Sequence, residues 1–484
     1  MADKAKIGLI GLGVMGENLA LNIERNGFPI SIYNRTVERV DEFINARGKG
    51  KQVFGYHDDK SFVESLERPR KIILLVKAGA PVDQTVEKLL PFLEKDDIII
   101  DGGNSHFTDT IRREKDLAAK GIRFIGSGVS GGEEGALWGP SLMPGGDRKA
   151  YEEIKPIWEA IAAKSSDGPC VTYLGPNGAG HFVKMVHNGI EYGDMQLIAE
   201  IYDVMKRGLG LKANQIGDIF EEWNKGILDS FLIEITAKIL SVTDPETGKF
   251  LVDLIVDKAG QKGTGKWTGE IALDLGIAIP TIDAALTGRL LSALKDERVV
   301  ASKKLTGPSE ASVNAADSKK VLAALQDALY ASKVCSYAQG MALIRAGSNE
   351  YKWNVDLSEC ARIWEGGCII RAKLLQTIKQ AFKRQGDVNN LLVDPEFSAW
   401  IVEHQANWRY AVTTAVNAGI PVPALSASLA YFDSYRCANL PQNLTQAQRD
   451  FFGAHTYERV DKPDAGFMHT DWPSLIKEKT GKPS

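Results

Sequence analysis

The sequence has few cysteines, few histidines and no long apolar run. Its five cysteines, at positions 170, 335, 360, 368 and 437, are an odd number without a Cys-x-x-Cys pair, so we expect scattered buried thiols and not a disulfide framework. The seven histidines include no His-x-x-x-His pair, and we expect no metal site. No apolar stretch approaches the roughly 18 residues of a membrane-spanning helix. The polar start, residues 1–6, argues against a signal or transit peptide.

The charge is nearly balanced, with 62 acidic and 58 basic residues and a formal net charge of −4. This balance gives no electrostatic reason to expect binding to nucleic acid or to an anionic membrane. Hydrophobic residues make up 44% and charged residues 25%, which is typical of a globular protein, and we expect it to be cytoplasmic. Glycine is the abundant residue, with 47 of 484 against about 7% on average.

The first part of the chain, residues 1–178, alternates short β-branched runs with helical stretches. The runs predict strands at 6–10, 29–33, 71–77, 97–101, 122–126 and 170–174, and the periodic stretches predict helices at 17–26, 37–47, 82–93 and 109–120. Continuous apolar strands that alternate with helices indicate a parallel sheet covered on both faces, a doubly wound α/β fold.

The second part, residues 179–440, changes to helical periodicity. It predicts helices at 182–207, 214–227, 231–240, 282–294, 319–346, 358–384, 396–418 and 425–436, which is typical of an all-helical domain. Residues 441–484 carry scattered proline and glycine with little periodicity. We expect them to form an extended tail that reaches a partner subunit.

A glycine-rich turn follows the first predicted strand. It consists of Gly11, Leu12, Gly13, Val14, Met15 and Gly16. The order strand, G-x-G-x-x-G, helix is the dinucleotide-binding fingerprint, in which backbone N–H groups at the helix start receive a pyrophosphate. A Rossmann-type domain is therefore expected, and the alternative is a tight strand–helix turn without a ligand.

The end of the second predicted strand favours NADP over NAD. Asn34, Arg35 and Thr36 stand where an NAD-binding chain usually has an acidic residue. A guanidinium can bind the 2′-phosphate that a carboxylate would repel, although Arg35 could also be an ordinary solvated arginine. Val76, Lys77 and Ala78, where the strand 71–77 ends, are also expected to contact the cofactor.

A second glycine cluster spans residues 126–146. Ser130, Gly131 and Gly132 lie in it, just after a predicted strand, and Asn104 follows the preceding strand in the same way. Ligands bind at the carboxyl ends of such strands, so these two loops are candidates for a pocket wall. Each could instead be a flexible surface loop.

One face of the helix 182–207 carries candidate catalytic residues. Lys184, His187, Asn188 and Glu191 recur at i, i+3, i+4 and i+7 and therefore project from the same side. Lys184 and Glu191 lie roughly 10 Å apart along the axis, which suits a base and an acid that act on one multi-carbon substrate. The alternative is a solvated helix face with a Lys–Glu pair.

The segment 260–266 imitates a nucleotide-binding P-loop but lacks its final residue type. Trp267 stands where serine or threonine would hold magnesium, which argues against a nucleoside triphosphate. Lys262, Thr264 and Lys266 could still bind a simple phosphate.

Five phrases resemble the decarboxylating 6-phosphogluconate dehydrogenase family of the β-hydroxyacid dehydrogenase superfamily. They are VSGGEEG at 129–135, GPSLMPGG at 139–146, FVKMVHNGIEY at 182–192, KGTGKW at 262–267 and AQRDFFGAHTY at 447–457. The resemblance runs from the first strand to about residue 472. The sequence departs from the family at Gly13, where the family usually has alanine.

The resemblance implies oxidation of 6-phosphogluconate by NADP to ribulose 5-phosphate, CO₂ and NADPH, in the oxidative pentose phosphate pathway and in gluconate utilization. It implies that Lys184 is the base and Glu191 the acid, and that no metal is needed. It assigns the sugar acid to Asn104, Ser130, Gly131, Gly132, His187 and Asn188, and the substrate phosphate to Tyr192, Lys262, Thr264 and Arg289. It also implies a homodimer in which Arg449 and His455 complete the neighbouring subunit's site.

Two other functions remain open at this point. The chain could be another β-hydroxyacid dehydrogenase that acts on a small unphosphorylated acid such as 3-hydroxyisobutyrate. It could also be an NADPH-binding protein without catalytic activity.

Overall fold

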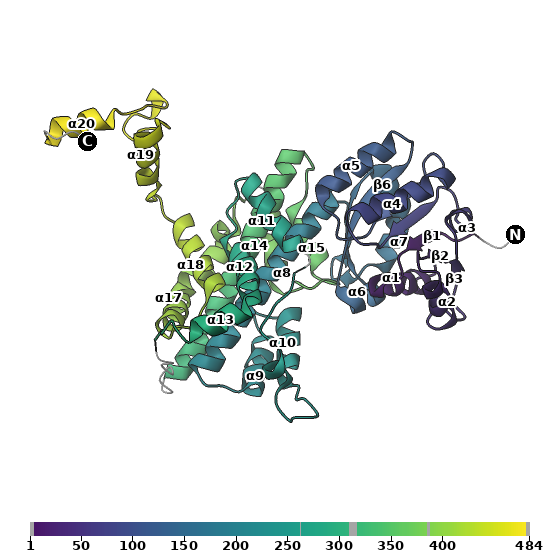
Figure 1. Cartoon of the computed structure of the whole chain (residues 1–484), viewed down its shortest axis with the longest axis horizontal. Helices are drawn as coiled ribbons and strands as arrows, with labels where there is room; N and C mark the ends of the chain where they lie inside the picture. The colour runs from purple at the N-terminus through teal and green to yellow at the C-terminus, as the bar shows by residue number, and fades with distance from the viewer. Residues whose placement is uncertain (1–3, 262, 309–316, 385–387, 481–484) are drawn as a thin grey trace. The chain divides into compact units, whose positions relative to one another are not determined.

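The computed structural model describes residues 4–261, 263–308, 317–384 and 388–480 (Figure 1). The chain divides into two compact units, one that ends at Leu429 and one that begins at Ala430. The sequence-based limits of 1–178, 179–440 and 441–484 remain predictions. Among the described residues, no helix combines the length and the apolar character needed to span a bilayer.

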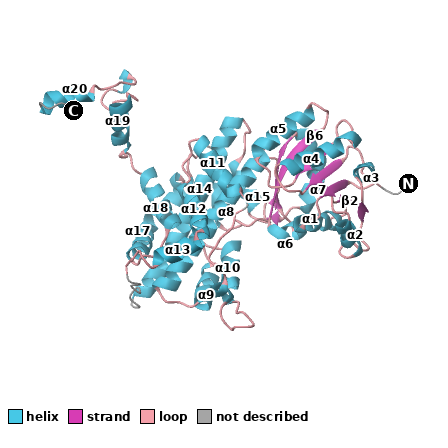
Figure 2. Ribbon diagram, in the orientation of Figure 1, coloured by secondary structure: helices cyan, strands magenta, loops and turns pink. Residues whose placement is uncertain are grey.

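The N-terminal part of the first unit holds a seven-stranded sheet, drawn in magenta in Figure 2. Its strands are β1 (Ile7–Ile10), β2 (Ile30–Tyr33), β3 (Val53–Tyr56), β4 (Lys71–Leu74), β5 (Ile98–Asp101), β6 (Arg123–Ser130) and β7 (Ser141–Gly146). They lie in the order β3-β2-β1-β4-β5-β6-β7. The pairs from β3 to β6 are parallel, and β7 is antiparallel to β6. The predicted doubly wound sheet is confirmed, and its strand order reverses between β1 and β4.

Apolar residues of the sheet alternate between two cores, one on each face. Ile73 packs into one core, whereas its neighbours Ile72 and Leu74 pack into the other, as the two-residue period of a strand requires. The helices of this part are α1 (Val14–Arg25), α2 (Glu38–Asn45), α3 (Asp59–Glu64), α4 (Ala80–Leu89), α5 (Phe107–Ala118), α6 (Gly132–Trp138) and α7 (Arg148–Ile161). Helices α1, α2 and α7 contribute to the first core, and α3, α4 and α5 to the second.

Three differences from the predicted strands concern the edges of the sheet. Two of them lie at the edge formed by β7. The predicted strand 170–174 forms only an isolated bridge between Val171 and Leu142 of β7, so this prediction was wrong. Strand β7 was not predicted, because Pro144, Gly145 and Gly146 are poor strand formers. Strand β3 is short and was also missed.

The glycine-rich turn between β1 and α1 shows two different uses of glycine. Gly11 has φ +109°, which favours glycine, and its N–H donates to the Tyr33 carbonyl at 3.1 Å. A Cβ at Gly16 would overlap the Gly11 carbonyl, whereas a Cβ at Gly13 would meet no atom within 4 Å. The protein itself therefore tolerates alanine at position 13, and glycine there leaves more room for a ligand.

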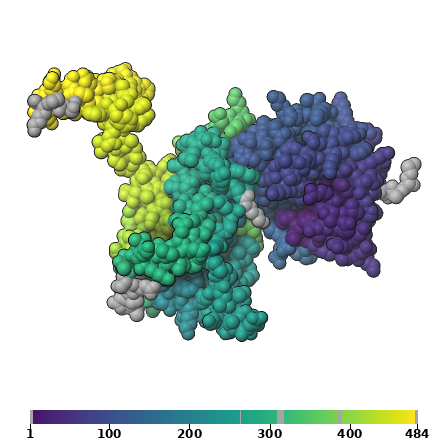
Figure 3. Space-filling view, viewed as in Figure 1, coloured from purple at the N-terminus to yellow at the C-terminus, as the bar shows by residue number. Residues whose placement is uncertain are grey.

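The rest of the first unit is helical, as predicted. Its helices are α8 (Ala179–Asp203), α9 (Ala213–Trp223), α10 (Phe231–Ser241), α11 (Thr264–Asp274), α12 (Pro280–Ala293), α13 (Lys295–Ser302), α14 (Ser318–Tyr351), α15 (Leu357–Trp364), α16 (Leu374–Arg384) and α17 (Pro395–Asn417). Helix α18 (Pro423–Tyr435) begins in the first unit and ends in the second. A π-helical turn, Val204–Gly208, extends α8. In the space-filling view the teal and green helical residues lie directly against the blue N-terminal part (Figure 3).

Helix α8 is the centre of this helical part and packs against α11, α12 and α14. All its residues from Ala179 to Ile190 are buried. Glycines allow the close approach of neighbouring elements: a Cβ at Gly180 would overlap the backbone of β6 and β7, and a Cβ at Gly193 would overlap Ser336 of α14. The start of α8 is thus held directly against the sheet.

The predicted helix 358–384 is two helices, α15 and α16. The chain leaves the helical path at Gly366 and Gly367, where Gly367 has φ +66° and its carbonyl accepts from Ser141 N of β7 at 2.7 Å. Helices α11 and α13 were not predicted.

Beyond the end of α18, the described part of the second unit forms the helices α19 (Gln442–Gly453) and α20 (Trp472–Thr480), where an extended tail was expected. The buried Asp450 carboxylate accepts from Thr470 N at 3.1 Å, from Trp472 Nε1 at 2.8 Å and from Thr456 N at 3.0 Å. A single buried acceptor therefore organises this unit.

Candidate active site

A cleft of about 460 Å³ opens at the point where the strand order reverses. Of the predicted cofactor residues, seven line it: Gly11, Gly13, Asn34, Arg35, Thr36, Val76 and Lys77. Buried Leu12 contributes through its backbone, since its N–H donates to Asn34 Oδ1 at 3.0 Å. Val14, Met15, Gly16, Ala78 and Asn104 are not part of this lining.

The lining of the cleft is strongly basic. Arg35 is joined by Lys77 and by two cations that the sequence reasoning missed, Arg39 of α2 and Lys88 of α4. Arg39 Nη1 donates to the Leu12 carbonyl at 3.3 Å. Arg39 follows Arg35 by four residues near the start of a helix. This spacing was the feature of the sequence that could have predicted Arg39 as a second cation of the cleft. Such a surface suits a polyanionic ligand, and the residues present fit a dinucleotide that carries a 2′-phosphate.

The predicted catalytic face of α8 is buried and internally hydrogen-bonded. Lys184 Nζ donates to Asn188 Oδ1 at 2.5 Å, and Asn188 Nδ2 donates to Thr264 Oγ1 of α11 at 2.9 Å. Asn188 therefore bridges the lysine to a residue that the sequence had assigned to the substrate phosphate. The sequence-predicted grouping of Lys184, His187 and Asn188 is present in the structure.

Lys184 is 7% exposed, and burial lowers the pKa of its ammonium group, with Glu191 and Cys368 opposing that shift. Its stem lies against β6, where a Cβ at Gly128 would overlap it. One glycine of the second cluster thus makes room for the lysine. A neutral amine in a water-poor site is suited to accept a proton.

His187 is fully buried beside this lysine. Burial and the neighbouring Lys184 lower its pKa to about 3, so the imidazole is neutral at physiological pH. Its Nδ1 lies 3.1 Å from Asn188 Oδ1 and its Nε2 lies 3.4 Å from Ser130 Oγ. Since Oδ1 can only accept, Nδ1 carries the proton and Nε2 can accept from the hydroxyl. His187 is suited to hydrogen bonding and not to acid catalysis.

Glu191 lies one turn beyond His187, and its Oε2 is 4.0 Å from His187 Nδ1. Burial raises the pKa of its carboxyl group, while Lys184 and Arg289 lower it and Asp194 raises it. Its side chain is 21% exposed. A carboxyl group with a raised pKa and partial access to solvent can donate a proton and be reprotonated.

Tyr192 and Arg289, two of the residues predicted to bind the substrate phosphate, lie in contact with each other. The Arg289 guanidinium lies 3.5 Å from the centre of the Tyr192 ring, and its Nη1 donates to the Gly260 carbonyl at 2.9 Å. A Cβ at Gly265 would overlap the Tyr192 ring, so glycine lets α11 pack against the tyrosine. Lys262 lies outside the described residues.

The two predicted loops at the strand ends differ in character. Gly131 and Gly132, at the start of α6, have φ +112° and +63°, which favours glycine at both. Asn104 is exposed in a loop that Asp101 holds, accepting from Gly103 N at 3.0 Å and Ser105 Oγ at 2.6 Å. Neither loop is therefore an unconstrained surface loop, because positive φ angles define the first and side-chain hydrogen bonds hold the second.

Arg449 and His455 are exposed residues of the second unit. Arg449 Nη1 donates to Gln446 Oε1 at 3.0 Å. Their part in an active site stays a prediction.

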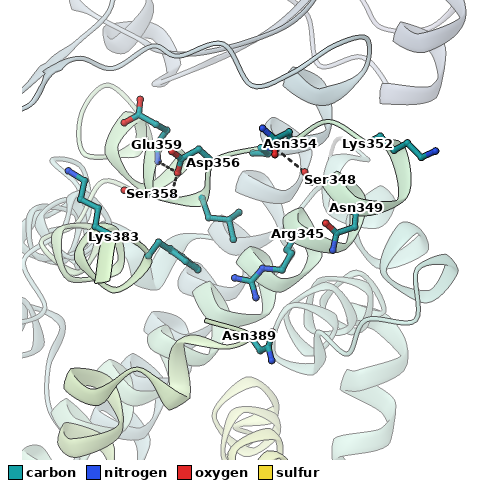
Figure 4. Close-up of a pocket in the computed structure, with 13 residues that line it drawn as sticks. Arg345, Ser348, Asn349, Lys352, Asn354, Asp356, Ser358, Glu359, Lys383 and Asn389 are labelled. Carbon is teal, nitrogen blue, oxygen red and sulfur yellow. Dashed lines mark hydrogen bonds between the residues drawn. The ribbon is translucent and has the colours of Figure 1, made fainter. Parts of the chain in front are cut away.

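A larger cavity, of about 910 Å³, lies between the end of α14 and helices α15 and α16 (Figure 4). It contains none of the predicted site residues. Its Asp356 caps α15 and accepts from Ser358 N at 2.8 Å and Glu359 N at 3.2 Å. This carboxylate serves the helix, and the cavity assembles no catalytic group comparable to the face of α8.

Comparison with known families agrees with this geometry. The family description "NAD binding domain of 6-phosphogluconate dehydrogenase" matches residues 6–175, and "6-phosphogluconate dehydrogenase, C-terminal domain" matches residues 180–472. The chain belongs to the 6-phosphogluconate dehydrogenase family.

Curated relatives named 6-phosphogluconate dehydrogenase are similar over nearly the whole chain. The NADP⁺-dependent, decarboxylating 6-phosphogluconate dehydrogenase of Bacillus subtilis is 57% identical over 470 residues, which cover 97% of this chain and 99% of that protein. The decarboxylating enzyme 1 of Spinacia oleracea is 55% identical over 484 residues, covering 99% and 100%. The solved 6-phosphogluconate dehydrogenase of Plasmodium falciparum, described with NADP⁺ and with 6-phosphogluconate, is 47% identical with a TM-score of 0.91, covering 96% and 100%.

The basic cleft predicts how the two dinucleotides are distinguished. Replacing Arg35 with alanine should weaken NADP binding roughly 10- to 100-fold, because a charge-assisted contact to the 2′-phosphate is lost. NAD lacks that phosphate, so its dissociation constant should change less than about threefold by the same argument. Calorimetric titration of both cofactors measures the two effects.

Arg68→Ala is the matched control, because Arg68 is 59% exposed and precedes the amino end of β4, whereas the cleft lies beyond the carboxyl ends of the strands. It removes the same charge and should leave both affinities unchanged. Equal losses for NADP and NAD in Arg35→Ala would contradict the 2′-phosphate assignment.

Proposed function

We propose that the protein catalyses the NADP-dependent oxidative decarboxylation of 6-phospho-D-gluconate to D-ribulose 5-phosphate, CO₂ and NADPH. Membership of the family and the names of its relatives support the reaction. The main support from this chain's own structure is the position of Lys184. Lys184 is buried and hydrogen-bonded to Asn188, on a helix that starts against the sheet of the N-terminal part.

Lys184 is the proposed base of the oxidation. Its amine accepts the proton of the carbon-3 hydroxyl, and NADP, when bound, supplies the acceptor for the hydride from the same carbon. The lowered pKa of Lys184 means that the amine is available as a base below the ordinary titration range of lysine. Burial is therefore what makes a lysine usable for this step.

Loss of CO₂ follows from the product of the first step, a β-keto acid. As the carbon–carbon bond to the carboxylate breaks, its electron pair moves towards the new carbonyl, and the Lys184 ammonium group stabilises the developing enolate. Glu191 then donates a proton to the carbon that lost the carboxylate. The proton on its carboxyl group is retained because burial raises its pKa.

The surrounding residues would hold the substrate. Asn104, Ser130, Gly131, Gly132, His187 and Asn188 are proposed to bind the sugar acid, and Tyr192, Thr264, Arg289 and Lys262 its phosphate. We further propose a homodimer in which Arg449 and His455 complete the partner's site. The Arg289 guanidinium over Tyr192 supports the phosphate assignment most directly, because stacking uses the face of the guanidinium and leaves N–H groups along its edge that can donate to an anion.

The substrate assignment is tested by comparing NADP reduction with 6-phosphogluconate and with unphosphorylated acids such as 3-hydroxyisobutyrate. We expect turnover with the phosphorylated acid and release of CO₂ in equal amount to NADPH. Preference for a small unphosphorylated acid would refute the assignment. Tight cofactor binding without turnover of any acid would favour a non-catalytic NADPH-binding protein.

Replacing Lys184 with methionine should abolish most of the activity, because methionine fills the space of the stem without a proton acceptor. We expect kcat to fall roughly 100- to 10,000-fold, the usual contribution of general acid–base catalysis. The affinity for NADP, measured by fluorescence titration, should stay within about twofold because the basic cleft is untouched.

Lys238→Met is the control, since Lys238 is 69% exposed and lies in α10, away from the residues assigned to the reaction. It should have wild-type activity. A Lys184→Met enzyme that keeps more than about a tenth of kcat would exclude Lys184 as the base.

A further inference from the structure

The functional face of α8 continues one turn beyond Glu191, to Asp194. Residues 184, 187, 191 and 194 recur at i, i+3, i+7 and i+10, so Asp194 lies on the same side of the helix as the proposed acid. Asp194 is 1% exposed. An isolated carboxylate at this depth would be costly, so the residue that pairs with it matters.

Lys333 of α14 is that partner. Its ammonium group lies 2.5 Å from Asp194 Oδ2, and Lys333 is itself 2% exposed. The Tyr337 hydroxyl is 3.4 Å from the same oxygen and donates to the Ile370 carbonyl at 2.8 Å. Among the described residues, Asp194 Oδ1 has no hydrogen-bond partner. The carboxylate is thus held from one side by α14.

Such a buried ion pair adds little net stability, because the loss of hydration offsets the attraction between the charges. Its consequence for the site is electrostatic. Burial raises the pKa of Asp194, and Lys333 lowers it, so the ammonium group favours the ionised carboxylate. The negative end of the pair therefore lies on α8, one helical turn from Glu191, and its positive end lies on α14.

The other groups that face Glu191 come from all the packed elements. Lys184 and neutral His187 lie on α8 itself, Arg289 on α12, and Cys368 on the segment between α15 and α16. From α14, Lys333 and Tyr337 contact Asp194. Helix α11 presents Thr264 and Thr268, while its Lys266 and Glu270 pair with each other at the surface. Asp194 is the nearby negative charge that opposes the cations Lys184 and Arg289.

We propose that the Asp194–Lys333 ion pair is a positioning element of the active site, which keeps the proton on Glu191 between two cations. Asp194 acts through Glu191 and not on the reacting atoms. This inference rests on the proposed function of Glu191 as the acid. Without the negative charge, the cations Lys184 and Arg289 would favour loss of the proton that the last step needs.

The test is the pH profile of kcat for 6-phosphogluconate oxidation in the double variant Asp194→Asn/Lys333→Met, which removes both charges at similar volume. The limb at high pH, where Glu191 loses its proton, should move down by about one pH unit, a tenfold change in proton affinity. The limb at low pH, which reports Lys184, should stay in place. The dissociation constants of NADP and 6-phosphogluconate should be unchanged.

Two comparisons separate this effect from the loss of any buried pair. Arg70→Met/Asp97→Asn removes another buried ion pair, 2.8 Å long, just before the amino ends of β4 and β5, and should leave both limbs unchanged. Lys333→Arg keeps the charges and should retain the wild-type profile.

If the double variant does not fold, Lys333→Gln replaces it. The unpaired Asp194 then takes up a proton instead of remaining charged, and the high-pH limb should move down as well. A limb that stays at the wild-type position in the folded double variant, or in Lys333→Gln, overturns the proposal. Absence of wild-type turnover with 6-phosphogluconate would instead refute the proposed function.

Discussion

The burial of one lysine amine is the constraint on which the rest of this structure depends. Lys184 needs a site dry enough to lower its pKa and still connected by hydrogen bonds to polar neighbours. Helix α8 meets both needs because its first three turns are buried between the sheet, α11 and α14. The glycines at 128, 180 and 193 serve this packing, since a side chain at any of them would overlap a neighbouring element.

The same helix distributes charge along its length. Basic Lys184 is followed on the same helix by two acidic residues, Glu191 and Asp194, and Lys333 of α14 pairs with Asp194. Each buried charge shifts the proton affinity of the next, because the low-dielectric interior screens them poorly. The basic cleft is different: its cations Arg35, Arg39 and Lys77 are exposed, so that water screens their charges.

Local patterns predicted the parts of the site that lie within single elements. Each of these parts is marked by residues a few positions apart in one segment of the sequence. They are the turn 11–16, the end of β2 at Arg35 and the helix face from Lys184 to Glu191. Strand β7 was missed because Pro144 and two glycines conceal it. Helix α19 was missed because Asp450 is its only buried residue, so no apolar period marks it. Lys88 and Lys333 enter their sites only through tertiary packing, and Lys333 is 139 residues from Asp194.

The protonation of Lys184 in the wild-type enzyme tests the central claim most directly. Carbon-13 NMR of lysines labelled at the ε-carbon, with Lys184 assigned by its absence in Lys184→Met, follows the amine through a pH titration in the presence of NADP. We expect this resonance to titrate below the ordinary lysine pKa of 10.5. A Lys184 amine that titrates at or above that value would contradict it, because the lysine would then be charged when the substrate arrives.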